Sequence, residues 1–408
     1  MGSVPSVAWA FSPLDEELEL LPGCLTPHAH ECLVRLGTWV PFGKSAQMMA
    51  EILQVEVSPA TSRRYTEAAG AAYEAVQKEE VDRIERTVPP APGGADRQMF
   101  SVDGAMVPLV KGEWAEVKTL VVGEVRATQQ SDGSQQVDTY QLSYFSRLTD
   151  ADNFNRLALV ETQRRGLENT PQVAAVVDGA EWIQGFIDTH RPDAVRILDF
   201  PHAAQRIGQI SQLIFDDAGE QWLRAQLHTL KHEGPTAVLT ELEHLAQTHP
   251  DQPLLTENLA YLHKRQAQMQ YPAYQTQGWP IGSGAVESAN KLVVEARLKG
   301  AGMHWSRSQV NPMLALRNIV CSDRWSQEWP QIAERLRHQT RQHRRQQQLH
   351  RRPQPQPRPL LDDLPVAALP NEPPPPTSPP DKPYRPPANH PWRHSPVGRA
   401  RFRSQQKI

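Results

Sequence analysis

The spacing of apolar residues changes abruptly near residue 98, and this change constrains the fold more than any other feature of the sequence. Before it, apolar residues recur every three or four positions, which is typical of amphipathic helices. After it come three β-rich runs, MFSVDGAMVPLV, WAEVKTLVVGEVRA and DTYQLSYFSRL, with SDGS between the second and the third. The pattern predicts a helical region followed by strands, the last two joined by a hairpin loop at SDGS.

Two further apolar strands follow, each preceded by a helical pattern. A helix is predicted over NFNRLALVETQRRG, a strand over VAAVVDGA, a helix over EWIQGFIDTH and a strand over AVRILDF. Sequential hairpin strands followed by buried strands with helical crossovers predict a mixed sheet. We therefore expect an α/β fold class, with the element order of a ribonuclease H-like catalytic core.

The first 87 residues are expected to form an α-helical N-terminal domain. Within it, SAQMMAEIL and SPATSRRYTEAAG have the arrangement of a helix-turn-helix, with Ser58 as N-cap of the second helix and Gly70 beyond its end. Such a second helix would present Arg63 and Arg64 to a DNA groove. A plain helical hairpin is the alternative, and the acidic surroundings indicate a modest grip on DNA.

The remaining boundaries follow from composition. Pro and Gly clusters in TVPPAPGGADRQ mark a linker, and 17 of the 44 residues from 353 to 396 are proline, which predicts a disordered or polyproline segment. The expected segments are a linker at 88–98, the first part of the catalytic core at 99–202, a helical insertion at 203–276, a catalytic helix that completes the core at 277–325, a basic helical segment at 326–352 and a Pro-rich tail at 353–408.

The composition is that of a globular protein. With 408 residues and 39 % hydrophobic content, the chain can fill two or three domains. No apolar run approaches the roughly 18 residues that a membrane helix needs, so no membrane partner is expected. Cys24, Cys32 and Cys321 are too few and too scattered for a disulfide framework, which predicts a cytoplasmic protein.

Charge is segregated along the chain although the net charge is only -3. Residues 1–90 hold 7 Lys and Arg against 13 Asp and Glu, whereas residues 291–358 hold 14 against 4. A basic block in a nearly neutral protein indicates a polyanionic partner at that region. A solvated helix face is the alternative for this block.

Two carboxylates stand at or near the ends of predicted strands. Asp103 follows the apolar MFSV, Asp178 ends VAAVV, and each precedes a glycine that would let a ligand approach the backbone. Phosphoryl transfer with two divalent cations needs two or three converging carboxylates. An aspartate after a strand is also a common turn former or helix N-cap, an alternative that is stronger for Asp178 because the strand of Asp103 continues.

A third carboxylate is expected on the helix that follows the Gly-rich turn, where Glu287 and Glu295 both lie. At about 100° per residue the two point about 80° apart. Glu287 shares a stripe with Lys291 and Arg297 and lies nearer the turn, so we choose it as the third ligand. Compensation of the helix dipole is the alternative role for a Glu in a first turn.

These motifs together resemble insertion-sequence transposases of the ISKra group, which are similar to Mutator-like transposases. The resemblance covers roughly residues 14–320 and is carried by SVDGAMVPL, VVDGAEWI, DFPH and PIGSGAVESANKLVVEARLKGAGMHW. It implies a DDE transposase whose catalytic and metal-binding residues are Asp103, Asp178 and Glu287. Two Mg²⁺ ions, replaceable by Mn²⁺, are the implied cofactors.

By the same resemblance, Asp199 and His202 form a D-x-x-H signature between the second acid and the third. A helix N-cap and an ordinary core or surface histidine are the alternatives for this pair. The functional hypothesis is that His202 contacts DNA or orients the site.

The resemblance also implies the partners. They are the inverted-repeat ends of the element and target DNA, with a homo-oligomer assembled on the DNA at the nucleoid of a prokaryote. Lys291, Arg297, Lys299 and Arg307 are expected to neutralise DNA phosphates. A structure-specific nuclease on the same fold and a transposase-derived DNA-binding regulator are the alternatives.

Overall fold

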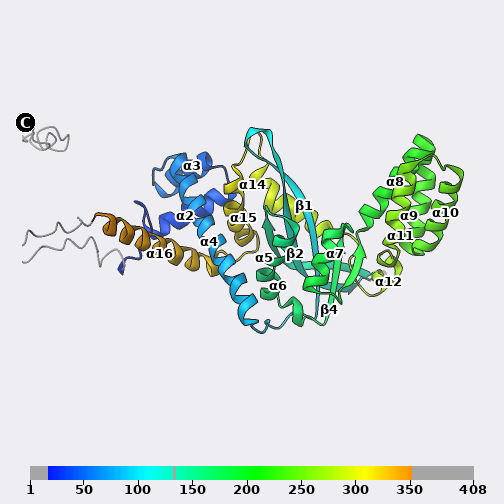
Figure 1. Cartoon of the computed structure of the whole chain (residues 1–408), viewed down its shortest axis with the longest axis horizontal. Coiled ribbons are helices and arrows are strands. Elements are labelled where there is room, and N and C mark those ends of the chain that lie inside the picture. Colours follow the sequence, from blue (N-terminus) through cyan, green and yellow to red (C-terminus); the bar gives the residue numbers. More distant parts are fainter. Residues whose placement is uncertain (1–16, 132–134, 352–408) are drawn as a thin grey trace, which may run out of the picture. The chain divides into compact units, whose positions relative to one another are not determined.

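A five-stranded mixed sheet organises the chain, of which the computed structural model describes residues 17–131 and 135–351 (Figure 1). The strand order is β3-β2-β1-β4-β5. The strands are β1 (Arg97–Pro108), β2 (Trp114–Gln129), β3 (Gln135–Arg147), β4 (Gln172–Val177) and β5 (Val195–Leu198). All but the first residue of the predicted SDGS loop, and the predicted Pro-rich tail at 353–408, lie outside the described residues.

The strands run in two senses. β1, β2 and β3 are antiparallel neighbours, whereas β4 runs parallel to β1 and β5 runs parallel to β4. The chain enters β4 after α5 (Ala151–Leu157) and α6 (Leu159–Arg164), and it enters β5 after α7 (Glu181–His190). The predicted α/β class with a mixed sheet is therefore confirmed.

Alternation along β1 assigns its side chains to two faces of the sheet. Phe100 and Val102 join a core with α5, α6 and α7, whereas Ala105 and Val107 pack on the opposite face. The elements that cover this opposite face near Ala105 are α13 (Gly284–Ala289), the π-helical turn η5 (Asn290–Glu295), α14 (Ala296–Leu298) and α15 (Arg307–Cys321). Asp103 shares the face of Ala105 and therefore lies toward α13 and η5.

The segment expected as a helical insertion is helical. It contains α8 (Phe200–Phe215), α9 (Glu220–His232), α10 (Pro235–Thr248), α11 (Pro253–Lys264) and α12 (Tyr271–Thr276). Their apolar faces share a core with Met99, Ala174 and Ile197 of the sheet. Among the described residues, no helix is long and apolar enough to cross a membrane.

The N-terminal region contains α2 (Pro27–Trp39), α3 (Phe42–Leu53) and α4 (Pro59–Thr87). Ser58 caps α4 as predicted, because its hydroxyl accepts a hydrogen bond from the Thr61 N–H at 3.1 Å. These helices share one apolar core with α15 and α16 (Trp325–Arg351). Residues from the two ends of the described chain therefore pack together.

The predicted end of the second N-terminal helix before Gly70 is wrong, since α4 continues to Thr87. Gly70 is buried in the middle of α4 against α15. A Cβ atom added to Gly70 would lie 2.1 Å from the carbonyl oxygen of Pro312. Glycine is needed here for close approach of two helices, not for a helix end.

Candidate functional site

Three aspartates stand level with one another on neighbouring strands, Asp103 within β1 and Asp178 and Asp199 directly after the carboxyl ends of β4 and β5. The parallel register of β1 with β4, continued three residues past its last pair, sets Asp103 opposite Asp178. The register of β4 with β5, continued one residue, sets Asp178 opposite Asp199. Ligands of parallel sheets bind outside these strand ends. The sheet therefore delivers three carboxyl groups to one end of its parallel strands.

Asp103 is half-buried and is held by two neutral donors. Its Oδ1 accepts a hydrogen bond from the Gly104 N–H at 2.7 Å, and its Oδ2 accepts one from Nδ2 of Asn290 at 2.9 Å. Burial raises the pKa of Asp103, the charge of Asp178 raises it further, and the two hydrogen bonds and His202 act in the opposite direction. The negative charges of Asp103 and Asp178 therefore repel each other, and a cation between them would relieve this repulsion.

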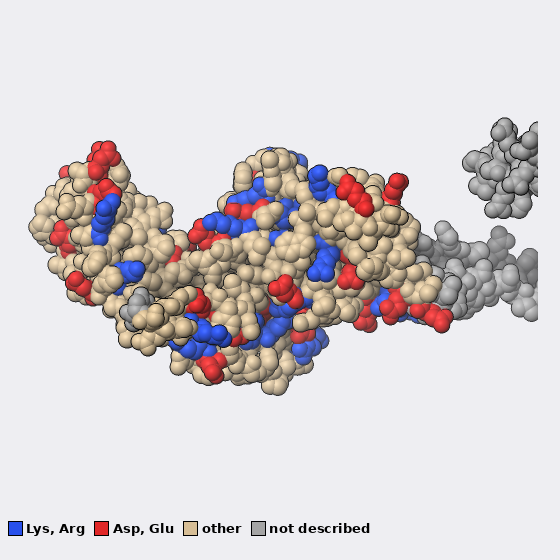
Figure 2. Space-filling view, turned by 180° about the vertical axis from the view of Figure 1, so that it is seen from behind, with Lys and Arg blue, Asp and Glu red and all other residues tan. Residues whose placement is uncertain are grey.

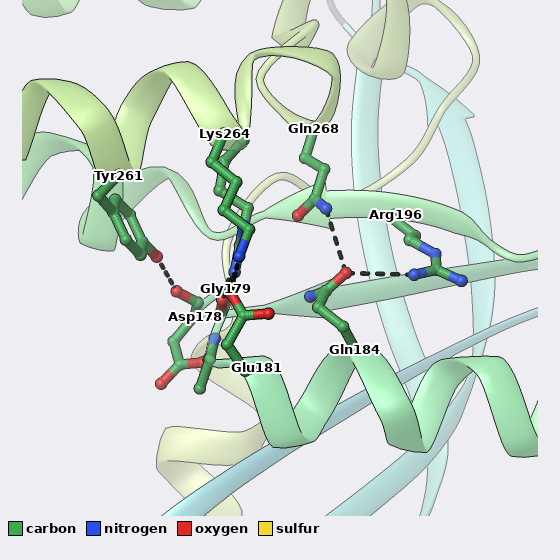
Figure 3. Close-up of polar contacts among 10 residues, drawn as sticks. Asp178, Gly179, Glu181, Gln184, Arg196, Tyr261, Lys264 and Gln268 are labelled. Atoms are coloured by element: carbon green, nitrogen blue, oxygen red, sulfur yellow. Dashed lines mark hydrogen bonds and ion pairs between the residues drawn. The ribbon is translucent and has the colours of Figure 1, made fainter.

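Asp178 is fixed through its backbone by the helices at 200–276. The Tyr261 hydroxyl, on α11, donates a hydrogen bond to the carbonyl oxygen of Asp178 (Figure 3). Arg265, just after α11, donates from Nε to the carbonyl oxygen of Gly179 at 3.0 Å. The side-chain Oδ1 of Asp178 accepts from the Ala180 N–H at 2.8 Å, which closes the turn before α7.

Gly179 makes this contact with α11 possible. Its φ is +79°, and an added Cβ would lie 2.7 Å from the Tyr261 hydroxyl and 3.0 Å from Nε of Arg265. The glycine after Asp178 was expected to admit a ligand to the backbone, but in the structure it admits these two side chains. Tyr261 and Arg265 were not identified from the sequence, because they lie 83 and 86 residues from their partners and no local pattern marks them.

Asp199 and His202 form a hydrogen-bonded pair at the start of α8. Asp199 is buried and occupies the N-cap position, but its carboxylate makes no capping hydrogen bond. Its Oδ1 accepts from the Ser283 N–H at 2.6 Å, and its Oδ2 accepts from Nδ1–H of His202 at 2.5 Å. This arrangement excludes the alternative of a simple side-chain cap.

The His202 side chain is 42 % exposed, and the charges of all three aspartates affect its pKa. The hydrogen bond to Asp199 raises the pKa of His202, burial lowers it, and the charges of Asp199, Asp178 and Asp103 raise it, so that the net direction is upward. A protonated imidazole beside these three carboxylates is thereby favoured, and its charge suits an anionic ligand.

Glu287 does not join the aspartates. Its side chain is 68 % exposed and forms an ion pair of 2.6 Å with Lys291. Helix α13 passes into the π-helical turn at Asn290, so the uniform rotation that separated Glu287 from Glu295 does not hold here. Among the residues of 17–131 and 135–351, no three Asp, Glu, His or Cys side chains lie close enough together to hold a metal ion. The role of Glu287 as third ligand stays a prediction.

Arg297 is not available for the phosphate contact expected of it. It is 2 % exposed, its Nε donates to the Gly37 carbonyl oxygen at 3.1 Å, and its guanidinium lies over the rings of Phe42 and Trp305. Burial lowers the pKa of Arg297 to about 10, and the neighbouring charge of Arg317 contributes in the same direction. The polar stripe predicted an exposed Arg297, but packing against the N-terminal helices buries this side chain.

The other expected phosphate ligands are accessible but paired. Lys291 pairs with Glu287, Lys299 lies 2.6 Å from Glu295, and Arg307 lies 3.8 Å from Glu113. Figure 2 shows basic and acidic side chains interspersed over one face of the chain. The basic block of the sequence is therefore partly neutralised by acids from elsewhere in the fold.

Arg63 and Arg64 are exposed near the start of α4, as a helix that reads DNA would require. The guanidinium of Arg64 lies 5.5 Å from the ring centre of Tyr65. Burial raises the pKa of Glu67, and the nearby charge of Arg63 opposes this shift in part. Nothing in these contacts prevents either arginine from meeting an anionic partner.

Comparison with known proteins adds no assignment. No protein-family model matches the sequence, and no curated protein matches it. The functional interpretation therefore depends on the residues and the geometry described above.

Proposed function

We propose that the chain is a DNA transposase that uses divalent cations to cleave and transfer DNA strands. The observation that carries the proposal is the placement of Asp103 and Asp178, level on adjacent strands and repelling each other. Within the described part of the chain, no Lys or Arg forms an ion pair with either carboxylate. Mg²⁺ is commonly bound by one or two carboxylates together with substrate phosphates, so Asp103 and Asp178 suit such an ion although the described residues form no complete metal site by themselves.

The sheet supports the same proposal. Its strand order and its change from antiparallel to parallel strands agree with the ribonuclease H-like core that the sequence predicts. The first acid stands within β1 and the second directly after β4. The helices at 203–276 separate these two acids from the predicted third, Glu287, as in the resemblance to Mutator-like transposases.

When bound, Mg²⁺ would stabilise charge on the phosphate and activate a water molecule or a DNA 3′-hydroxyl. The protein itself orients the groups that hold it. Asn290 and Gly104 fix the Asp103 carboxylate, while Tyr261 fixes the backbone of Asp178. His202, whose pKa is raised, would supply positive charge to a DNA phosphate bound near the aspartates.

DNA binding is the second part of the proposal. Arg63 and Arg64 would read the inverted-repeat ends, and Lys291, Lys299 and Arg307 would exchange their present acidic partners for phosphates. A homo-oligomer on the DNA and a nucleoid-associated location belong to the same proposal.

The test uses the full chain and DNA carrying the repeats that flank its coding region. Mg²⁺ should support cleavage and strand transfer, Mn²⁺ should replace it, and Ca²⁺ should support binding alone. Asp103→Asn, Asp178→Asn and Glu287→Gln should each abolish cleavage and leave DNA binding intact. Asp188→Asn is the matched control, because Asp188 is an exposed acid paired with Arg196.

Each outcome separates one alternative. Wild-type rates from Asp103→Asn and Asp178→Asn would overturn the proposed chemistry. Cleavage without strand transfer would indicate the structure-specific nuclease, and DNA binding without cleavage would indicate the regulator. If Glu287→Gln were active and Glu295→Gln inactive, the third ligand would be Glu295.

A further inference from the structure

We propose that Asn290 supplies an oxygen ligand to the divalent cation held by Asp103 and Asp178. This inference rests on the proposed function, since it concerns the same cation site. It assigns to Asn290 a role that the sequence did not indicate, because an Asn one turn after a candidate acid is an ordinary helix residue.

The first observation is an unpaired buried oxygen. Asn290 is 6 % exposed, and its Nδ2 donates to Oδ2 of Asp103 at 2.9 Å. Its Oδ1 is fully buried and has no hydrogen-bond partner among the described residues. Buried amide oxygens are nearly always paired, so an orphan beside a charged carboxylate indicates a missing partner.

The second observation is the chemistry around this oxygen. A hard divalent cation binds carboxylate and amide oxygens together. The register of β1 with β4, continued three residues past its last pair, sets Asp103 opposite Asp178, so two carboxylates already stand beside Asn290 at this level of the sheet. An amide oxygen at this position would bring a third oxygen ligand to the cation without adding a further negative charge.

The third observation is the way the helix presents Asn290. The π-helical turn η5 begins at this residue, and such turns are frequent at functional sites. Arg317, which is buried, holds the turn by donating to the carbonyl oxygens of Val293, at 3.2 Å, and Leu292. Asn290 therefore faces Asp103 from a fixed position, whereas Glu287, one turn earlier, is exposed.

A competing explanation is that Asn290 only orients Asp103 through its N–H group. The variant Asn290→Asp separates the two explanations. An aspartate offers oxygen ligands of the same size but cannot donate a hydrogen bond at neutral pH. It should therefore keep or strengthen cation binding if an oxygen at residue 290 reaches the cation, whereas a donor out of reach of the cation would leave Asp103 without its hydrogen bond and weaken binding.

The experiment is a titration of the full chain with Mn²⁺ alone, followed by electron paramagnetic resonance of free Mn²⁺. Asn290→Leu, which keeps the shape but removes both polar atoms, should weaken Mn²⁺ binding by about tenfold or more. Asn290→Asp should bind Mn²⁺ at least as tightly as wild type. Ser288→Ala, an exposed change on the same helix, should have no effect.

Thermal unfolding gives a second readout, which does not require that the Asn290→Leu variant folds. Asn290→Asp places a third carboxylate beside Asp103 and should lower the melting temperature in buffer without divalent cations. Saturating Mn²⁺ should restore it, because a ligand that binds only the folded state stabilises that state. A melting temperature that Mn²⁺ does not restore would overturn the inference.

Failure of this inference differs from failure of the proposed function. If Asp103→Asn and Asp178→Asn abolish Mn²⁺ binding but Asn290→Leu does not, only the role of Asn290 is wrong. Equal losses of binding in Asn290→Asp and Asn290→Leu would likewise leave Asn290 as a donor alone. If wild-type binding is absent or does not depend on Asp103 and Asp178, the cation site itself fails and this inference fails with it.

Discussion

Asp199 and His202 stand one helical turn apart at the start of α8, with Oδ2 and Nδ1 2.5 Å from each other. The second oxygen of Asp199 accepts from the Ser283 N–H, at the Gly-rich turn that precedes α13. One buried carboxylate thus links three elements: the end of β5, the first turn of α8 and the entry to the helix of Asn290. The orientation of His202 depends on this link.

Asp199→Asn is expected to lower the pKa of His202. The hydrogen bond to Asp199 is the largest cause of the upward shift, so its removal should return the pKa toward or below 6.5. Titration of the imidazole resonances by NMR measures this. His190 is the control, since burial lowers its pKa to about 4, and it should not respond. An unchanged His202 pKa would show that Asp199 does not control it.

The same pair predicts a pH dependence of folding. Because the pKa of His202 is raised in the folded state, its contribution to stability is complete below the unfolded value near 6.5. It is lost as the pH rises through the folded pKa. Urea unfolding of wild type and Asp199→Asn across this range measures the difference between their unfolding free energies. This difference should be largest below pH 6.5 and should fall to a constant value at high pH.

Asp103→Asn is expected to raise the melting temperature by a few degrees in buffer without divalent cations. Burial and the charge of Asp178 raise the pKa of Asp103, so the ionised carboxylate opposes folding at neutral pH. Added Mg²⁺ should stabilise wild type and not the variant. Asp188→Asn, which removes an exposed ion pair with Arg196, should give no such gain. A lower melting temperature for Asp103→Asn would contradict this account.

Gly179→Ala is expected to cost about 1 to 3 kcal/mol of unfolding free energy. The positive φ and the 2.7 Å approach of a Cβ to the Tyr261 hydroxyl both oppose a side chain here. Gly185→Ala is the matched control, because Gly185 lies within α7 with nothing within 4 Å of its Cβ position, and it should gain about 0.5 to 1 kcal/mol. Urea unfolding of both variants decides the matter.

Arg297→Ala is expected to destabilise the fold by about 2 to 5 kcal/mol, because it removes a buried side chain packed on Phe42 and Trp305. DNA affinity of the folded variant should stay close to that of wild type. Arg307→Ala, at an exposed position, should show the reverse: little change in stability and weaker DNA binding. Calorimetric melting and a binding titration together separate these outcomes.

Specificity and affinity for DNA are expected to depend on different residues. Arg63→Ala with Arg64→Ala should lower the preference for the cognate end by about 1 to 3 kcal/mol for each hydrogen bond to a base that the change removes. Lys299→Ala with Arg307→Ala should weaken all sequences alike and flatten the salt dependence. Titrations of cognate and scrambled ends at several salt concentrations measure both. Full cognate preference in the Arg63 and Arg64 variant would make α4 a structural element.

The sequence predicted those features that depend on short-range patterns. The strands of Asp103 and Asp178 are marked by local apolar runs, and the cap of α4 is marked by Ser58. The end of α4 was mispredicted because Gly70 allows the close contact of α4 with Pro312 and does not end the helix. No local sequence signal reveals this contact. A glycine can end a helix or bring two helices together, and only the tertiary structure distinguishes these uses.

The polar contacts of the site could not be predicted for the same reason. Asn290 lies 187 residues from Asp103 in the sequence, and the π-helical turn that presents it breaks the regular rotation assumed for that helix. The basic block was counted along the chain, but its members pair across the fold, as Arg335 does with Glu79. Net charge by segment therefore overstated the charge available to a polyanion.

Because Tyr261 and Arg265 donate hydrogen bonds to the backbone of Asp178 and Gly179, the folding of α11 helps to hold the second acid in place. Helices that interrupt the core in sequence thus stabilise the turn that follows β4 of the sheet. Local opening of α11 would release the turn before α7, so the amide hydrogens of the two segments should exchange with solvent as one cooperative unit. The lifetime of the assembled acid pair would then be set by the opening rate of a helix 83 residues further along the chain.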